Sequence, residues 1–281
     1  RAIIEVCPPS LYSTMPLSRP MSTPHFFFTV DVEEWFTSTK LIPINDDKPY
    51  REKSDIQETT NTLCTILREH GIRGTFFFIQ DIARRFPALV QSLLQEGHEI
   101  ALHGINHNDL RTVANEEFTD ALEQAKYFFQ TQFSVSLKGY RAPYFSLHRQ
   151  ALSLLKQAAF CYDSSVVPCL PIPGWYGTYQ APRVPYRIGE ELFEINPHST
   201  FLEFPMSVHP TLRIPGLGGY YFRNLGFRFT AHLLRACLKK YNYAMFYIHP
   251  WELSPSIPHL QGMPFYMHRR TGKWTQDALH A

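Results

Sequence analysis

The sequence lacks the features that mark several large classes of protein. It has no run of about 18 apolar residues, so no transmembrane helix is expected. Its formal net charge is only +2 over 281 residues, which gives no strong attraction to nucleic acid or to an anionic surface. Its five cysteines are odd in number and form no CxxC pair. This favours a reducing compartment and argues against a cysteine-based zinc site.

Three common catalytic motifs are also missing. No glycine-rich loop follows an apolar strand, so no phosphate-binding loop is predicted. No GxSxG sequence occurs, which disfavours a serine hydrolase. His103 and His107 are four residues apart, but Gly104 follows the first of them, so the pair is not the HExxH motif of zincins.

The first 24 residues contain no basic segment followed by an apolar one, so no secretory signal is visible. Because they are rich in proline and serine, we expect residues 1–24 to form a poorly ordered arm. Met21 stands directly before the first apolar run and is a candidate for the natural start. A cytoplasmic location is the corresponding prediction.

The most informative stretch is an apolar run, 26–30, that ends in the three carboxylates of Asp31, Glu33 and Glu34. The run predicts a buried strand, and charged groups leave water at a high cost unless they are paired or bind a metal. In an extended backbone Asp31 and Glu33 face the same side and Glu34 faces the other. The stretch therefore predicts a functional site.

The remaining pattern predicts a single α/β domain over residues 25–253. Apolar runs alternate with segments of helical apolar spacing, which is typical of parallel βαβ units. Within this domain we interpret 165–225, rich in proline, glycine and tyrosine, as a loop-rich elaboration. Residues 254–281 are predicted to form a C-terminal extension with some helical potential.

Further polar residues each follow one of the apolar runs directly. In a parallel barrel the carboxyl ends of all strands lie on one face, so these groups should converge. Two histidines four residues apart can reach one cation, and a carboxylate from another strand end would complete a two-histidine, one-carboxylate metal site. A pair of hydrogen-bonded surface histidines is the alternative. The residues concerned are His103 and His107, Arg141, and His249 with Glu252.

The two acids on one side of the first strand suggest a division of roles. If one binds the metal, the other can act as general base on a metal-bound water, whose pKa falls to about 7 in favourable sites. Arg141 is the candidate for keeping that base ionised. Asp163 lies in an Asp-Ser-Ser sequence that predicts a turn, although it could also line the cleft.

Taken together, these motifs resemble the polysaccharide deacetylase family, the NodB-homology or carbohydrate esterase family 4 group. The resemblance spans 26–252 in the family's order, and it points to a subgroup encoded with bacterial exopolysaccharide loci. The resembling sequences are Thr29-Val30-Asp31-Val32-Glu33, Gly74-Thr75-Phe76-Phe77, His103-x-x-x-His107, Arg141-Ala142-Pro143-Tyr144 and Ile248-His249-Pro250-Trp251-Glu252.

The resemblance implies a distorted (β/α) barrel and hydrolytic removal of N-acetyl groups from N-acetylhexosamine residues of a glycan. It implies a divalent metal, Zn²⁺ above all, held by His103, His107 and an acid, for which we take Glu33 rather than Glu34. Asp31 matches the family's base and Arg141 its partner. Tyr144 matches the residue whose backbone N–H helps to hold the oxyanion, and His249 matches the general acid.

Three further residues are candidates for flanking or lining the substrate: Trp35, Trp251 and Asp163. The chain departs from the family pattern where Val32 separates the two acids and where Gly104 replaces a hydroxyl residue after the first histidine. Two alternatives stay open at this point. One is a metal-dependent amidohydrolase that acts on a small or lipid-linked amide, and the other is a non-catalytic glycan-binding barrel.

Overall fold

The structure is a computed structural model that describes residues 3–4, 22–37, 44 and 46–281. Most of the predicted N-terminal arm lies outside these residues. Among the described residues, no helix is long and apolar enough to cross a membrane.

The described residues contain one nine-stranded sheet. Its strands are paired in the order β1-β2-β3-β4-β5-β6-β8-β7, and β9 also pairs with β2. All pairs are parallel except β7 with β8. The bounds are β1 (Ile3–Ile4), β2 (His25–Val32), β3 (Thr75–Phe78), β4 (Glu99–Leu102), β5 (Gly139–Tyr140), β6 (Tyr162–Asp163), β7 (Tyr186–Arg187), β8 (Leu202–Glu203) and β9 (Tyr243–Ile248).

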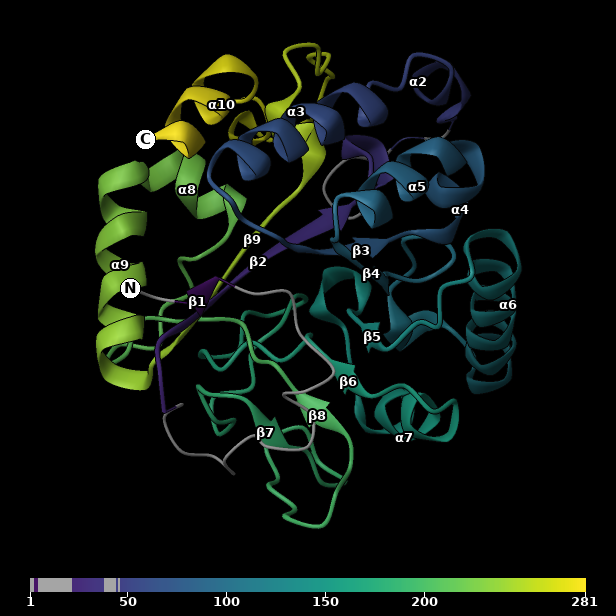
Figure 1. The fold of residues 1–281 in the computed structure, drawn as a ribbon, viewed down its shortest axis with the longest axis vertical. Coiled ribbons are helices and arrows are strands. Elements are labelled where there is room, and N and C mark those ends of the chain that lie inside the picture. The colour runs from purple at the N-terminus through teal and green to yellow at the C-terminus, as the bar shows by residue number, and fades with distance from the viewer. Residues whose placement is uncertain (1–2, 5–21, 38–43, 45) are drawn as a thin grey trace.

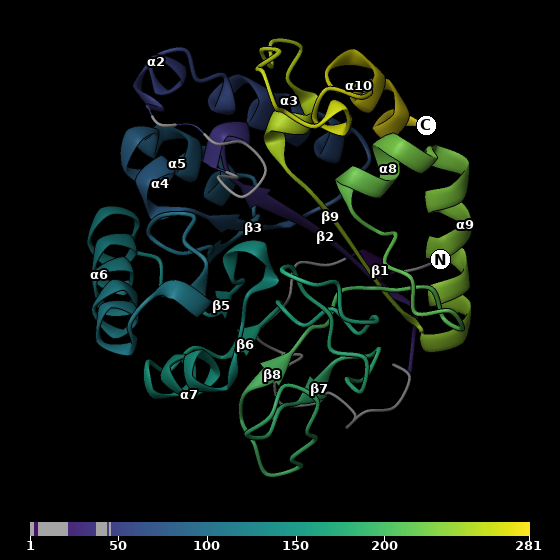
Figure 2. The same cartoon turned by 180° about the vertical axis from the view of Figure 1, so that it is seen from behind.

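Helices surround the outside of this curled sheet, while the loop-rich segment with β7 and β8 lies at the bottom of the view (Figure 1), as the view from behind also shows (Figure 2). This arrangement is the predicted α/β barrel in a distorted, incomplete form. The helices are α2 (Lys48–Arg51), α3 (Ile56–Glu69), α4 (Gln80–Arg85), α5 (Pro87–Gln95), α6 (Asn115–Phe133), α7 (Arg149–Gln157), α8 (Gly219–Leu225), α9 (Phe227–Tyr241) and α10 (Lys273–His280). Short 3-10 turns are η1 (Trp35–Thr37), η2 (Leu110–Thr112), η3 (Pro143–Phe145), η4 (Pro250–Leu253) and η5 (Phe265–Met267).

The central strand β2 separates two hydrophobic clusters. Phe28, Val30 and Val32 pack into the larger cluster between the sheet and the helices. Phe27 packs on the other face, in a cluster with residues of β3, β4 and β9 inside the barrel. Since side chains alternate along a strand, Asp31 lies on the same face as Phe27. The alternation thus places this acid inside the barrel, at the carboxyl end of β2.

The C-terminal residues belong to the same body as the barrel. The turn η4 and helix α10 both contact α3. The loop-rich segment joins the sheet through β8, which pairs in parallel with β6. The chain from β8 to α10 is therefore packed against the first half, and its loops can contribute to a shared site.

Candidate active site

Sequence-distant polar residues converge at the carboxyl ends of the strands, as predicted. They line a cavity of about 320 Å³ that is open to solvent. Eight residues that follow the predicted strands line it: Asp31, Glu33, His103, His107, Tyr144, His249, Trp251 and Glu252.

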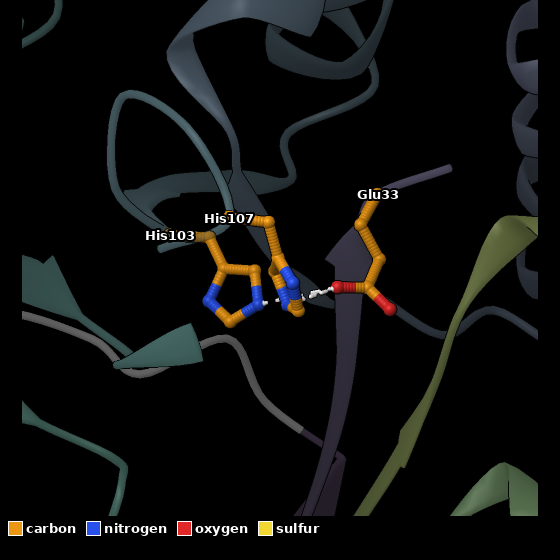
Figure 3. Close-up of side chains that lie close together, drawn as sticks. All are labelled: Glu33, His103 and His107. Carbon is orange, nitrogen blue, oxygen red and sulfur yellow. Dashed lines mark ion pairs between the residues drawn. The ribbon is translucent and has the colours of Figure 1, made fainter. Parts of the chain in front are cut away.

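Three of these side chains form a compact cluster. Glu33 Oε2 lies 2.5 Å from His107 Nε2 and 3.7 Å from His103 Nε2. The three potential ligand atoms all lie within 4.8 Å of one another, and all three residues are buried. Figure 3 shows both imidazole rings, from the loop after β4, turned toward the carboxylate at the end of β2. Cation binding requires such convergence of donor atoms.

The outer nitrogens of the two rings face main-chain carbonyl oxygens. His103 Nδ1 lies 2.7 Å from the carbonyl oxygen of Arg141, and His107 Nδ1 lies 3.3 Å from that of Thr37. A carbonyl oxygen can only accept, so each Nδ1 donates its proton there. Each Nε2 can then present a lone pair to a cation, which is the usual arrangement of metal-binding histidines.

The carboxylate in this cluster is held in its ionised form. Burial alone would raise the pKa of Glu33, but the imidazoles of His107 and His249, in their protonated form, lower that pKa well below its usual value. In addition, Glu33 Oε2 is buried and accepts no hydrogen bond of normal geometry. A buried anionic oxygen without a regular donor is costly, and a bound divalent cation would compensate that cost. The donor set therefore fits a metal.

Glu34 has a different environment from Glu33. Its Oε1 accepts hydrogen bonds from Ser54 Oγ at 2.6 Å and from Arg85 Nη1 at 3.1 Å. It is buried and does not line the cavity. These contacts tie the end of β2 to the start of α3 and to α4, so Glu34 has a structural explanation that does not involve the metal cluster.

Asp31 pairs with Arg141 inside the barrel. Arg141 Nη1 donates to Asp31 Oδ1 at 2.6 Å, and both side chains are almost fully buried. The same nitrogen donates to Thr29 Oγ1, and the other guanidinium nitrogens donate to Ser164. Arg141 is thus fixed on several sides, which fixes the carboxylate it holds.

Tyr144 has a backbone conformation that is rare for a residue with a side chain. Its φ is 55° and its ψ is 15°, in the left-handed region, and Phe145 after it also has a positive φ. Its hydroxyl donates to the carbonyl of Thr37, and its ring lies against His107, with the ring centroids 4.4 Å apart. Such conformations are concentrated at functional sites.

His249 connects the cavity to a buried ion pair. Its Nε2 lies 3.4 Å from Glu33 Oε1, and its Nδ1 lies 2.8 Å from Glu252 Oε1. Burial would lower the pKa of His249, but the carboxylates of Glu33, Glu252 and Asp31 raise it to about 9. Glu252 in turn accepts from Arg223 Nε at 2.5 Å. Sequence reasoning assigned no role to either Glu252 or Arg223.

Two residues predicted to contact substrate do not line the cavity. Trp35 lies in η1 and packs on Tyr50 and Phe36, with ring centroids 5.0 and 5.4 Å away, respectively. Asp163 is fully buried and accepts hydrogen bonds from the main-chain N–H and hydroxyl of Ser165. Trp35 is thus a core residue, and Asp163 is covered because it lies within β6. Trp251 does line the cavity, where it stacks on His249.

Aromatic residues from the second half of the chain form much of the remaining wall. They come from a loop after β6, from α8, from β9 and from η5, and sequence reasoning did not assign them to the site. The high tyrosine content of 165–225 was the available signal. The residues are Trp175, Tyr176, Tyr220, Tyr221, Tyr247 and Tyr266.

The fold and the site together describe an α/β barrel with acids and histidines at the carboxyl ends of its strands. Residues 41–162 match the family model of Polysaccharide deacetylase, so this part of the chain is similar to that family. Residues 164–280 match a second family model, described as Domain of unknown function (DUF3473). The aromatic wall, Arg223, His249 and Glu252 all lie within this second match.

Curated relatives support the same family. The chain is 28% identical over 159 residues to a chitooligosaccharide deacetylase of Azorhizobium caulinodans, a match that spans 56% of this chain and 69% of that protein. Two other matched relatives, a peptidoglycan deacetylase-like protein and a peptidoglycan-N-acetylglucosamine deacetylase, are covered over only 31% and 32% of their lengths.

Solved structures match the fold over almost the whole chain. A polysaccharide deacetylase structure from Mycobacterium smegmatis superposes with a TM-score of 0.58 and 20% identity, covering 95% of this chain and 94% of that one. A carbohydrate esterase family 4 pseudoenzyme from Bacillus anthracis superposes with a TM-score of 0.50 and 11% identity, covering 92% and 59%. At these identities the likeness shows the distorted barrel fold.

Proposed function

We propose that the protein is a metal-dependent hydrolase that removes acetyl groups from N-acetylhexosamine residues of an oligosaccharide or polysaccharide. One observation carries the proposal. A carboxylate and two imidazoles converge at one point in an aromatic-lined cavity, with an arginine-paired acid and a carboxylate-paired histidine beside them.

Glu33, His103 and His107 would hold the metal, and a set of two nitrogens and one oxygen suits Zn²⁺. When bound, this ion would polarise the acetamide carbonyl and lower the pKa of a water molecule. The contacts of Glu34 with Ser54 and Arg85 support the choice of Glu33 as the acidic ligand.

Asp31 acts as the general base in this scheme. Its carboxylate takes a proton from the attacking water, whose oxygen forms a bond with the acetamide carbon. Arg141 fixes the position of this carboxylate through the 2.6 Å contact. The backbone N–H of Tyr144, in its strained turn, donates to the oxyanion; such a donor is typically worth about 2.7–4 kcal/mol.

His249 acts as the general acid. Its Nδ1 is held by Glu252, and its Nε2 points toward the cluster at the cavity floor. As the C–N bond breaks, the proton on Nε2 passes to the departing nitrogen, which leaves as the amine of the deacetylated sugar. The acetyl group leaves as acetic acid, which gives its proton to solvent or to the amine and becomes acetate. The proton held by Asp31 returns to His249 through water, so atoms and charge balance over the cycle.

The aromatic wall supports a sugar as the substrate, since rings of this kind stack on the apolar faces of hexoses. We also propose a role in exopolysaccharide biosynthesis, which rests only on the resemblance of the motifs. A cytoplasmic location is likewise part of the proposal.

The experiment that tests the proposal measures acetate release from a panel of N-acetylated glycans and small amides, with and without a chelator. Release from N-acetylglucosamine oligomers that stops on chelation is the expected result. Release from small amides alone would favour an amidohydrolase. Glycan binding by metal-loaded protein without any acetate release would favour a non-catalytic barrel, which the likeness to a pseudoenzyme makes a specific second candidate.

A further inference from the structure

A buried chain of charged groups runs from helix α8 to the cavity. Arg223, in α8, donates from Nε to Glu252 Oε2 at 2.5 Å, and Glu252 Oε1 lies 2.8 Å from His249 Nδ1. Side-chain exposure falls from 17% at His249 to 0% at Glu252 and 1% at Arg223. All three residues border the cavity, but only the side chain of His249 is appreciably exposed.

Arg223 has partners besides Glu252. Its Nη1 donates to the main-chain carbonyls of Tyr266 at 2.9 Å and Arg269 at 2.6 Å, and its guanidinium lies over the ring of Trp251, 5.3 Å from the centroid. These contacts hold the plane of the guanidinium in one orientation. Its hydrogen bonds are made to the protein, so it is suited to position Glu252 rather than to bind substrate.

Glu252 is fixed from three sides. Besides Arg223 and the ring of His249, the backbone N–H of His249 donates to Glu252 Oε1 at 3.2 Å. Helix α8 also approaches closely at Gly219, where an added Cβ would lie 1.9 Å from Glu252 Oε1. A glycine is needed there because any side chain would displace the carboxylate.

We propose that Arg223 and Glu252 form a positioning relay that holds His249 as the proton donor to the leaving amine. The inference rests on the function proposed above, and it gives the 164–280 segment a defined role: this segment completes the active site by supplying the proton donor and its two supporting residues. Charge-assisted hydrogen bonds of this kind hold an imidazole in one tautomer and one orientation.

The relay predicts a dependence on the leaving group. An amide nitrogen is a poor leaving group and needs the proton from His249 as the C–N bond breaks. An aryl acetate releases a phenolate that is stable without that proton. Losing the relay should therefore slow amide hydrolysis far more than aryl ester hydrolysis, whereas a general loss of structure would slow both.

The test uses the full chain loaded with Zn²⁺, with N-acetylchitotriose as the amide and 4-nitrophenyl acetate as the ester. For Arg223→Gln and Glu252→Gln we expect kcat on the amide to fall about 100-fold or more. The KM should stay within about 2-fold and ester turnover within about 3-fold of the wild type. Metal content should be unchanged. Because the two residues act as one unit, the double variant should lose little more than either single one.

The matched control is Arg270→Gln. Arg270 contacts the main-chain carbonyl of Arg223 and stacks on Trp274, but it does not contact Glu252, so both activities should be retained. If Arg223→Gln does not fold, the ratio of amide turnover to ester turnover in Glu252→Gln tests the relay by itself.

Equal losses on the amide and the ester, or an amide kcat that stays at the wild-type value, would overturn the relay. A different result would reject the proposed function: wild-type protein that hydrolyses the ester but releases no acetate from any N-acetylated glycan. That result would also reject the relay, because the relay rests on the proposed function.

Discussion

Asp31 and Arg141 are 110 positions apart in the chain, yet their side chains form a 2.6 Å ion pair inside the barrel. Arg141 is completely buried and Asp31 nearly so. Removing one partner of such a buried pair typically lowers the protein's free energy of unfolding by about 3–5 kcal/mol. Substitutions that keep the shape of the side chain are therefore the ones that can separate catalysis from folding.

Asp31→Asn is the first such substitution. It keeps the hydrogen-bonding shape but removes the group that would accept a proton from water. We expect acetate release to fall about 10²- to 10⁴-fold, with bound Zn²⁺ unchanged by elemental analysis. Near-normal turnover in a metal-replete Asp31→Asn protein would remove Asp31 from its role as base.

Glu33 and Glu34 give a matched pair of adjacent carboxylates with different environments. Glu33→Gln should lose stoichiometric Zn²⁺, because the residue lies in the cluster with His103 and His107. Glu34→Gln should keep the metal and lose about 1–3 kcal/mol of unfolding free energy, because its bonds to Ser54 and Arg85 weaken. Metal content and urea denaturation of both variants provide the measurement. The reverse pattern would make Glu34 the ligand.

Trp175 tests the aromatic wall. It lines the cavity and its ring lies against Tyr144, with the centroids 6.3 Å apart. Replacing it by alanine should raise the KM for N-acetylchitotriose about 10-fold, in line with the loss of one stacking contact of about 1–1.5 kcal/mol, and change kcat little. Trp35→Phe, which alters a tryptophan outside the cavity, should leave the KM unchanged. A KM that responds to Trp35 and not to Trp175 would mean that the substrate lies elsewhere.

Asp163 and Glu203 predict a pH dependence of stability. Burial and the neighbouring Asp163 raise the pKa of Glu203 well above its usual value, and burial raises that of Asp163 to about 6. In the unfolded chain both carboxyls titrate near pH 4. Above that pH the folded protein holds more protons than the unfolded chain, so the free energy of unfolding falls as pH rises toward the folded-state pKa values.

Glu203→Gln should flatten this decline, since glutamine does not titrate. Urea denaturation of chelator-treated wild type and variant between about pH 5 and about pH 8 measures the difference without interference from bound metal. Parallel curves for the two proteins would show that the buried pair does not carry the effect.

The sequence predicted the first half of the site well, for a physical reason. The alternation of side chains along β2 placed Asp31 inside the barrel, and the rule that parallel strands end on one face brought His103 and His107 to it. Local periodicity was sufficient for both steps. The α/β barrel fold followed from the same alternation of strands and helices, together with the family resemblance.

The second half of the site could not be read in this way. Arg223 acquires its role only because α8 packs beside η4, and no spacing in the sequence links it to Glu252. Trp35, a candidate for flanking the substrate, does not line the cavity, because the chain turns in η1 and buries its ring against Tyr50. In both cases tertiary packing between distant segments decided the outcome, which local patterns do not encode.

The most direct test of the account is acetate release from N-acetylchitotriose by the full chain, measured with one equivalent of Zn²⁺, after chelation, and after Zn²⁺ is restored. The account predicts release that is lost on chelation, regained on restoring the metal, and nearly absent in Asp31→Asn at equal metal content. Release that survives complete removal of the metal would contradict it, and so would metal-loaded wild-type protein that binds the glycan and releases no acetate.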